Sequence, residues 1–384
     1  MKVIIAGGGT GGHLFPGLAL AEEFKRRDDA TEVVFVGTEH GIEANIIPRE
    51  GYPIKFLKAE GLVGRTLLAK IKALAKSAIS TIDAYRILDI VMPDIVIGVG
   101  GYASGALVLM AALRSVPTMI HEQNSVPGLT NKMLGSVVKR ICVTYHESLS
   151  SFPLGKTFLT GNPIRLKILR GEREAACRLF SLDKDMFTVF IFGGSSGARS
   201  INRAMVDALN HLNNLKNNIQ FLHQTGDKDF ENIRDAYRKA GVKGTVAPFI
   251  YQMAEAYAAA DVVISRAGAT TLAEITALGK PAILIPYPYA AGRHQELNAL
   301  KLREMGAAYV MLDNAMRGET LARNIQELYE NESIRAEMKR ASTGLGRPDA
   351  CGRIVDIAMS LIKEQRIANP PKSSFEKKGL KSIY

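Results

Sequence analysis

The feature that most constrains the fold of this chain occurs twice: an apolar strand, a glycine-rich turn and the start of an amphipathic helix. The first copy runs from Val3–Ala6 into Gly7–His13, and the second from Thr188–Phe192 into Gly193–Gly197. Short β-rich runs alternate with helical stretches after each copy, and this rhythm builds a mostly parallel sheet covered by helices on both faces. The sequence therefore predicts an α/β protein with two Rossmann-like parallel-sheet domains that face each other across a cleft.

The rhythm is interrupted at Thr160–Arg165, where Gly-Asn-Pro can continue neither a helix nor a central strand. We therefore expect a first domain over residues 1–162 and a second over residues 163–348. The length of 384 residues and the 47% apolar content are sufficient for two buried cores. Residues 349–367 predict a last amphipathic helix that packs back on the first domain, and residues 368–384 predict a basic, disordered tail.

Composition excludes several classes of protein. The three cysteines are far apart and form no CxxC pair, which argues against a disulfide framework or a zinc knuckle and is typical of a reducing cytoplasm. No apolar run reaches the roughly 18–20 residues of a membrane span, and Met1–Gly7 predicts a strand rather than a signal peptide. The net charge of +11 suits nucleic acid or an anionic membrane surface. Without tryptophan or a recognisable nucleic-acid motif, the membrane is favoured over nucleic acid.

The first glycine loop has the spacing of an anion-binding turn at a helix N-terminus. Gly7, Gly9 and Gly12 satisfy G-x-G-x-x-G, but a dinucleotide site also needs an acidic residue at the end of the second strand. The nearest acid there, Glu39, comes late, so NAD(P) binding is not favoured. His13 begins the following helix, whose partial positive charge keeps an imidazole neutral, as a general base requires. A purely structural role as a helix cap fits His13 equally well at this point.

The second half carries three further segments with the chemistry of a nucleotide-sugar site. The loop Gly193–Gly197 offers backbone N–H groups and hydroxyls to a diphosphate, which a plain turn would not need. In Ser265–Glu274, Thr270 and Thr271 fall in the first turn of a helix, and Glu274 lies on the same face, where it would accept two ribose hydroxyls. A surface carboxylate explains Glu274 at least as well from this segment alone.

The third segment, Pro286–Asn298, supplies His294, Gln295 and Asn298, whose uncharged polar groups suit a neutral sugar. Two other kinds of site are not favoured. Gly279-Lys280 is followed by Pro281, so the P-loop pattern is missing, and His121-Glu122 does not continue into H-E-x-x-H or another metal-ligand spacing.

These segments belong to a longer set of motifs, in the order GGGTGGHLFP, GVGGYASG, HEQNSVPGLTN, GNPIR, GGSSGARSIN, SRAGATTLAEI and PYPYAAGRHQELNA. Over nearly all of residues 1–365 the chain resembles the MurG family of bacterial glycosyltransferases, of the family 28 type. The resemblance implies a GT-B fold and inverting transfer of N-acetylglucosamine (GlcNAc) from UDP-GlcNAc to the N-acetylmuramic acid hydroxyl of lipid I, which makes lipid II for peptidoglycan. It also implies that UDP-GlcNAc is a substrate, with no cofactor and no metal in the active site.

The resemblance assigns residues to three roles. His13 is the implied catalytic base. The implied donor contacts are Thr10, Gly11, Gly12, Asn124, Arg165, Ser195, Ile250, Ala269, Thr270, Thr271, Glu274, His294 and Gln295. The implied acceptor-side residues are Gly9, Gly100, Gly101, Tyr102, His121 and Glu122. The chain departs from the family at Gly292-Arg293, where many relatives carry acidic residues, so the sugar contacts of this loop stay open.

A lipid-linked acceptor gives the basic charge a purpose. Between residues 62 and 76, an apolar stripe is edged by cations; it comprises Leu62, Val63, Leu67, Leu68, Ile71 and Leu74, with Arg65, Lys70, Lys72 and Lys76. Such a stripe suits an anionic bilayer surface, although an ordinary core-facing helix has the same pattern. The resemblance favours a peripheral protein on the cytoplasmic face of the cell membrane, with other cell-wall synthesis proteins as further candidate partners.

Two alternatives to this function remain open. One is another GT-B enzyme, such as a glycolipid glycosyltransferase or a UDP-sugar epimerase. The other is a non-catalytic protein that binds a nucleotide or nucleic acid. The motif HEQNSVPGLTN favours the MurG family over other GT-B enzymes, and His13 favours an enzyme over a binding protein.

Overall fold

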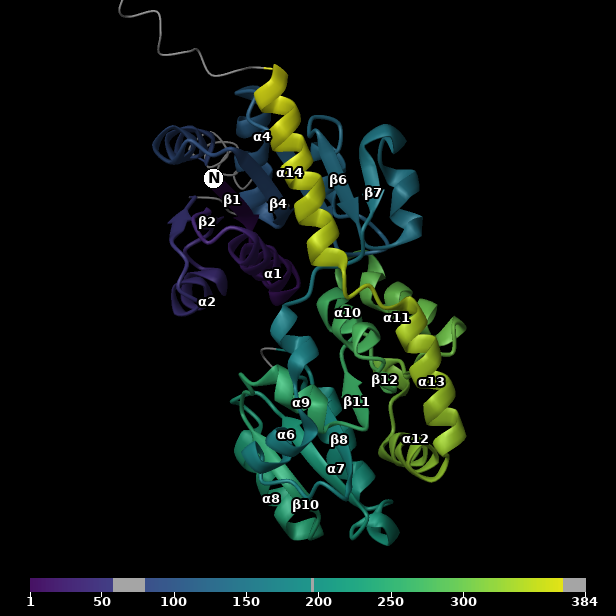
Figure 1. Ribbon diagram of the computed structural model, residues 1–384. Coiled ribbons are helices and arrows are strands. Elements are labelled where there is room, and N and C mark those ends of the chain that lie inside the picture. Colours follow the sequence, from purple (N-terminus) through teal and green to yellow (C-terminus); the bar gives the residue numbers. More distant parts are fainter. Residues whose placement is uncertain (58–79, 195–196, 369–384) are drawn as a thin grey trace, which may run out of the picture.

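The computed structural model describes residues 1–57, 80–194 and 197–368. These residues form two parallel sheets, one in each half of an elongated molecule (Figure 1). The first has the strand order β3-β2-β1-β4-β5-β6-β7, and the second has the order β10-β9-β8-β11-β12-β13. In each sheet the strand that precedes a glycine loop, β1 or β8, lies where the strand order reverses, which is the ligand-binding position of such sheets. The predicted α/β fold with two Rossmann-like parallel sheets is confirmed.

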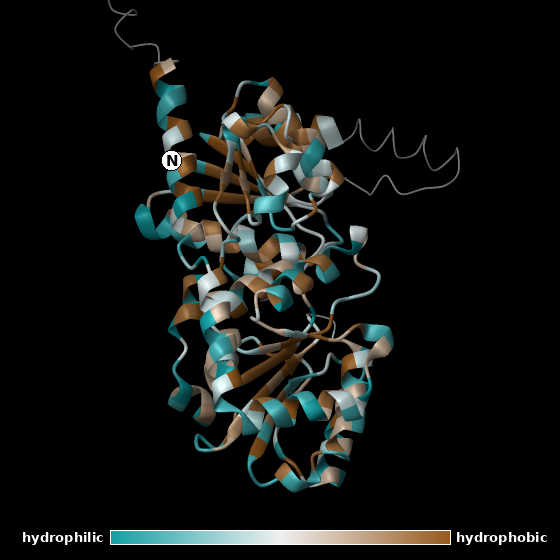
Figure 2. Ribbon diagram, turned by 90° about the vertical axis from the view of Figure 1, so that its right-hand side faces the viewer, coloured by the Kyte–Doolittle hydropathy of each residue, from teal (hydrophilic) through white to brown (hydrophobic). Residues whose placement is uncertain are grey.

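The first sheet is built from short, almost entirely apolar strands. Its inner strands are buried along most of their length, as expected when helices cover both faces, and Figure 2 shows them as the hydrophobic interior of this half. The strands are β1 (Lys2–Gly7), β2 (Glu32–Gly37), β3 (Ile54–Phe56), β4 (Ile95–Gly100), β5 (Thr118–Glu122), β6 (Arg140–Val143) and β7 (Thr157–Leu159). The helices around it are α1 (Gly11–Arg27), α2 (Glu43–Arg49), the helical residues 80–91, α4 (Tyr102–Leu113), α5 (Leu129–Leu134) and the 3-10 turns η1 (His146–Ser151) and η2 (Leu154–Lys156).

The second sheet repeats this plan with six strands. They are β8 (Phe187–Phe192), β9 (Ile219–Gln224), β10 (Lys243–Ala247), β11 (Val262–Ser265), β12 (Ala282–Leu284) and β13 (Tyr309–Val310). The helices are α6 (Arg173–Leu179), α7 (Arg199–Leu209), α8 (Phe230–Ala240), α9 (Met253–Ala259), α10 (Ala269–Ala277), α11 (His294–Glu304), α12 (Gly318–Glu330) and α13 (Glu332–Leu345). The 3-10 turns are η3 (Leu166–Arg170), η4 (Asn213–Leu215), η5 (Ala291–Arg293) and η6 (Asp313–Ala315).

The last helix, α14 (Ala350–Ala368), leaves the second half and lies across the first (Figure 1). Its apolar face, with Ile354, Val355 and Ala358, shares one buried cluster with Leu18 of α1. Arg27 of α1 also donates to the Gly352 carbonyl at 2.8 Å. Among the described residues, no helix has the length and apolar character needed to cross a bilayer. The stripe between residues 62 and 76 and the tail from residue 369 lie outside the described residues.

Several polar contacts between described residues join the two halves. The side-chain hydroxyl of Thr270, at the start of α10, donates to the Gly12 carbonyl at the start of α1 at 3.5 Å. The amide and hydroxyl of Ser125 donate to Asn298 Oδ1 at 3.2 and 2.8 Å. Lys301 of α11 pairs with Glu147 of η1. The N-termini of α1 and α10, each at the end of a glycine turn, therefore face each other across the boundary.

Candidate active site

Two glycine loops of the first half meet at the carboxyl ends of β1 and β4. Gly101 has a φ of +84°, and a Cβ there would lie 2.6 Å from the Gly8 carbonyl oxygen. A Cβ on Gly8 would in turn lie 2.2 Å from the Glu43 side chain. A side chain at Gly101 would push the two loops apart, and one at Gly8 would displace the Glu43 carboxylate. The two loops assigned to the acceptor diphosphate therefore form one continuous backbone surface, and exposed Tyr102 stands at its edge.

His13 lies on this surface, in the first turn of α1. Its Nδ1 is 3.2 Å from the Gly8 carbonyl oxygen, which can only accept, so Nδ1 carries the proton and the lone pair is on Nε2. Burial lowers its pKa below the ordinary value of 6.5, against the opposing effects of the Gly8 carbonyl and of the nearby Glu122 and Glu43 carboxylates. A neutral imidazole with Nε2 free to accept a proton is the form that a general base needs.

Glu43 braces the first glycine loop and was missed by sequence reasoning. Its Oε2 accepts from the Gly9 N–H at 2.7 Å, and its Oε1 accepts from the backbone and hydroxyl of Thr38 at 2.9 Å each. Glu39 is the first acid after the second strand, but the carboxylate that faces the loop is that of Glu43, four positions later. Both oxygens of the Glu43 carboxylate accept hydrogen bonds from the protein itself, so they do not serve a bound ribose. This agrees with the argument against a dinucleotide site.

His121 and Glu122, at the end of β5, lie behind the cleft surface. His121 is fully buried, with Nε2 3.1 Å from the Gly161 carbonyl, and burial lowers its pKa to about 4. Glu122 accepts from the backbone and side chain of Asn124 through Oε1, and from Gly128 and Asn131 through Oε2. The implied place of both residues on the acceptor side stays a prediction. Their burial suits them to holding the loop that carries Asn124.

In the second half, Gln224 at the end of β9 connects two segments that carry residues expected to bind the donor. Its Nε2 donates to the Gly194 carbonyl at 2.9 Å, and its Oε1 accepts from the Ile250 N–H at 2.9 Å. The glycine loop after β8 and the segment before α9 are therefore held together by one amide. Gln224 was not among the expected site residues. Ser195 lies outside the described residues.

The start of α10 brings together Ala269, Thr270, Thr271 and, one turn later, Glu274. Glu274 Oε2 accepts from the hydroxyl of Tyr257 at 2.8 Å. Burial raises the pKa of Glu274 to about 7, and only part of this rise is opposed by the Tyr257 hydrogen bond and the charge of Arg165. Glu274 is only partly exposed and its carboxylate is bonded to Tyr257, so it is not the solvent-exposed surface residue of the alternative interpretation.

The expected sugar contacts His294 and Gln295 lie at the start of α11. His294 Nδ1 lies 2.6 Å from the Ala291 carbonyl, and Gln295 Oε1 accepts from the Tyr287 N–H at 2.9 Å. Arg293, with a φ of +54°, turns its guanidinium to Glu296 in the first turn of α11. The positive charge that Arg293 brings to this position is therefore balanced by the carboxylate of Glu296.

Arg165 has partners that the sequence did not reveal. Its Nε donates to Glu22 at 2.7 Å, and its Nη1 and Nη2 donate to Glu50 at 2.7 and 2.6 Å. Both carboxylates belong to the first half, so this guanidinium ties the halves together. The expected contact with the donor stays a prediction.

The site as a whole combines groups from both halves. His294 lies close enough to His13 for its positive form to lower the pKa of His13, and Thr270 contacts Gly12. Helix N-termini, backbone amides and hydroxyls suit the phosphates and hydroxyls of a nucleotide sugar. Over residues 1–57, 80–194 and 197–368, no three His, Cys, Asp or Glu side chains are grouped to hold a metal ion.

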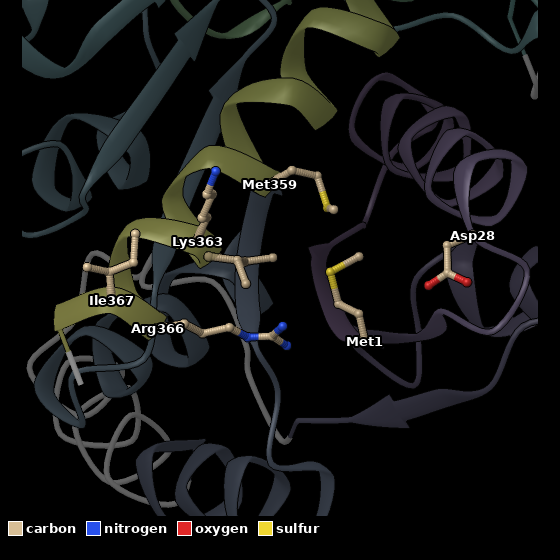
Figure 3. A pocket seen from close by; sticks show the side chains of 7 residues that line it. Met1, Asp28, Met359, Lys363, Arg366 and Ile367 are labelled. Carbon is tan, nitrogen blue, oxygen red and sulfur yellow. The ribbon is translucent and has the colours of Figure 1, made fainter. Parts of the chain in front are cut away.

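Two cavities lie outside this constellation. One of about 220 Å³ opens at the hinge between the halves, with Asn162 and Arg347 among its lining residues. The other, of about 470 Å³, lies between α14 and the residue that precedes β1. Figure 3 shows Met359, Lys363, Arg366 and Ile367 of α14 on one side of it and Met1 and Asp28 on the other. Because Met1 precedes β1, this groove is at the opposite end of the strands from the glycine loops.

Comparison with known proteins places this architecture in a family. Residues 3–143 match the N-terminal domain of glycosyltransferase family 28, and residues 188–354 match its C-terminal domain. The UDP-N-acetylglucosamine--N-acetylmuramyl-(pentapeptide) pyrophosphoryl-undecaprenol N-acetylglucosamine transferase of Thermodesulfovibrio yellowstonii is 49% identical over 366 residues, which cover 95% of this chain and 100% of that protein. The protein of the same name from Myxococcus xanthus is 46% identical over 94% of this chain and 93% of its own length.

Solved structures agree with this placement. MurG of Acinetobacter baumannii superposes with a TM-score of 0.73 at 30% identity, over 94% of this chain and 99% of that one. The UDP-GlcNAc 2-epimerase from Neisseria meningitidis, bound to UDP-GlcNAc, has a TM-score of 0.65 over 94% of this chain and 100% of that one, but only 13% identity, which shows a shared fold alone. The chain therefore belongs to glycosyltransferase family 28 and, within it, to the MurG family.

Proposed function

We propose that this enzyme transfers N-acetylglucosamine from UDP-GlcNAc to the N-acetylmuramic acid hydroxyl of lipid I, and so makes lipid II for peptidoglycan. The observation that carries the proposal is the identity of 49% along essentially the whole length of a relative that bears this transferase name. A UDP-sugar epimerase, the alternative, has support only from the shared fold. Another glycolipid glycosyltransferase is not favoured, because the full-length relatives carry the lipid I transferase name.

In the proposed mechanism the acceptor hydroxyl attacks the anomeric carbon as UDP leaves. His13 Nε2 takes the hydroxyl proton, which for a positioned general base is worth about 10²–10⁴-fold in rate. The leaving diphosphate gains negative charge. The N–H groups at the start of α10 and of the loop after β8 would stabilise that charge. The enzyme needs no bound metal for this step, because helix N-termini supply the positive potential.

The residue roles are part of the same proposal. The donor site comprises Thr10, Gly11, Gly12, Asn124, Arg165, Ser195, Ile250, Ala269, Thr270, Thr271, Glu274, His294 and Gln295. The acceptor side comprises Gly9, Gly100, Gly101 and Tyr102, with His121 and Glu122 behind them. The domain limits stay at residues 1–162, 163–348 and 349–367, with a tail over 368–384; the packing of α14 against α1 supports the assignment of the last helix to the first domain.

A transfer assay tests the function directly. Purified enzyme, UDP-GlcNAc labelled in the sugar and a soluble lipid I analogue are combined in the presence of EDTA. We expect label in the disaccharide product and no dependence on added divalent cations. Formation of free N-acetylmannosamine or its UDP conjugate without acceptor would favour an epimerase, and loss of transfer on chelation would contradict the metal-free mechanism.

We also propose that the enzyme works as a peripheral protein on the cytoplasmic face of the membrane. The charged apolar stripe between residues 62 and 76 supports this, together with the large apolar side chains exposed just after it. Ile82 and Tyr85 are about half exposed, at 54% and 50%, and Ile90 is 70% exposed. Exposed apolar groups beside cations suit an anionic surface. Other cell-wall synthesis proteins remain proposed partners.

Sedimentation with vesicles checks this proposal. We expect wild-type enzyme to bind vesicles that contain anionic lipid and to be released as salt is raised, because salt screens charge. The double substitution Lys70→Glu and Lys72→Glu should weaken binding. Lys228→Glu and Lys239→Glu, at exposed positions of the second half, impose the same charge change and should not. If both double variants lose vesicle binding to the same extent, the binding depends on net charge alone. That result would contradict a specific membrane-binding surface.

A further inference from the structure

A second constellation lies beneath the proposed donor site, around Arg266 at the end of β11. The guanidinium Nη1 donates to Asp313 Oδ1 at 2.5 Å and to the carbonyls of Ile285 and Pro286 at 3.2 Å each. Its Nη2 donates to the hydroxyl of Ser200 at 2.8 Å, and that hydroxyl donates to the same Asp313 oxygen at 2.7 Å. One guanidinium therefore joins the segments that follow four different strands of the second sheet: β8, β11, β12 and β13.

Two of these segments carry proposed donor contacts. Ser200 lies in the first turn of α7, directly after the glycine loop proposed to hold the diphosphate. Pro286 begins the loop proposed to hold the sugar. The carbonyl of Pro286 accepts from Arg266, and the N–H of the same peptide unit, on Tyr287, donates to Gln295 Oε1 at 2.9 Å. Because a peptide unit is planar and rigid, the position of Arg266 sets the position of the Gln295 amide.

The arrangement also sets which way the Gln295 amide faces. Its oxygen is occupied by the Tyr287 N–H, so its Nε2 is the group left to donate to a sugar hydroxyl. The Tyr287 ring lies against the Arg266 guanidinium, 5.5 Å from centroid to Cζ, which holds the loop from a second direction. The side chains of Arg266 and Asp313 are only 13% and 20% exposed, so water screens their pairing weakly.

We propose that Arg266 and Asp313 are positioning residues of the donor site, which fix the distance between the diphosphate loop and the sugar-binding amide of Gln295. This inference rests on the proposed function, since it assumes that Gln295 contacts the donor sugar. A planar guanidinium with several donors is needed, because it bonds two carbonyls, a carboxylate and a hydroxyl at once. A lysine keeps the charge but cannot reach these partners together.

The test is isothermal titration calorimetry of the full chain with UDP-GlcNAc and with UDP. We expect Arg266→Lys and Asp313→Asn to weaken UDP-GlcNAc binding by about 10- to 100-fold, because small misplacements of binding groups have effects of this size. UDP should lose less, since it lacks the sugar that Gln295 holds. In a Gln295→Ala background, Arg266→Lys should lower the affinity for UDP-GlcNAc by a much smaller factor than it does in the wild type. A merely structural role for Arg266 would not depend on Gln295.

The same strand supplies a matched control at its other end. Arg173 forms a bidentate pair with Asp261, with both distances 3.0 Å, where Asp261 directly precedes β11. Arg173→Lys and Asp261→Asn thus make the same changes far from the donor site, and they should leave both affinities unchanged. If Arg266→Lys does not fold, Ser200→Ala removes only the hydroxyl link and should still weaken UDP-GlcNAc more than UDP.

Two results would overturn the proposal. One is wild-type affinity for UDP-GlcNAc in the folded Arg266→Lys and Asp313→Asn variants. The other is that Arg266→Lys lowers the affinity for UDP-GlcNAc by the same factor whether or not Gln295 is present. A wild-type enzyme that fails to bind UDP-GlcNAc would instead overturn the proposed function, and the positioning role would fall with it.

Discussion

Replacement of His13 by alanine is expected to lower kcat for GlcNAc transfer by about 10²–10⁴-fold, the range for loss of a positioned general base. UDP affinity should stay nearly unchanged, because the imidazole faces the acceptor-side loops. The structural reason is the contact of Nδ1 with the Gly8 carbonyl, which leaves the Nε2 lone pair available. Steady-state kinetics with a lipid I analogue and calorimetry with UDP measure the two quantities separately.

The pH profile gives a second measure of the same residue. Burial lowers the pKa of His13 below 6.5, with His294 adding to the effect and Gly8, Glu122 and Glu43 opposing it. The base is active when neutral, so kcat/KM should be flat through neutral pH and should fall only as the pH drops below 6.5. The exposed His211 provides a control, and His211→Ala should alter neither rate nor profile. Joint loss of transfer and UDP binding in His13→Ala would mean that His13 is structural.

Local pattern predicted the parts of the site that local chemistry determines. The glycine loops, the helix start at Ala269 and the place of His13 at a helix N-terminus all follow from residues within one strand-turn-helix unit. Such units depend on short-range preferences that can be read from spacing. The βαβ rhythm also predicted the parallel pairing of the strands in both sheets, because a strand, helix and strand in succession build parallel neighbours.

The parts that sequence reasoning missed are contacts between distant segments. Arg165 was expected beside the donor diphosphate, yet it bonds Glu22 and Glu50, more than 100 positions away. Arg266 meets Asp313, which no motif connects to it. A charged side chain at the end of a strand has several possible partners among neighbouring loops, and only the three-dimensional arrangement selects one. The hydrogen bond between Tyr257 and Glu274 is a further contact that the separate segments did not predict.

Glu274 allows a prediction in which affinity and stability change in opposite directions. Glu274→Gln should weaken UDP-GlcNAc binding by about 10- to 100-fold, because hydrogen bonds to a charged acceptor are stronger than those to a neutral one. The same change should stabilise the donor-free enzyme at alkaline pH. Burial raises the pKa of Glu274 to about 7 in the folded chain, from 4.5. The unfolded chain therefore ionises first, and the folded state loses stability between these two values.

The gain from Glu274→Gln should thus be absent near pH 4.5, grow as the pH rises to about 7, and stay constant above it. The largest expected gain in the free energy of unfolding is about 3 kcal/mol, since each pKa unit corresponds to about 1.4 kcal/mol. The partial exposure of this carboxyl makes the gain smaller. Thermal unfolding without donor at about pH 4.5 and about pH 8 measures the difference, and Glu337→Gln on the exposed face of α13 is the control. An equal effect at both pH values would show that Glu274 is not held protonated by burial. If Glu274→Gln stabilises the enzyme at high pH but leaves the donor affinity unchanged, Glu274 does not bind the donor. A ribose bound to this carboxylate would favour its ionised form, which burial disfavours in the empty site.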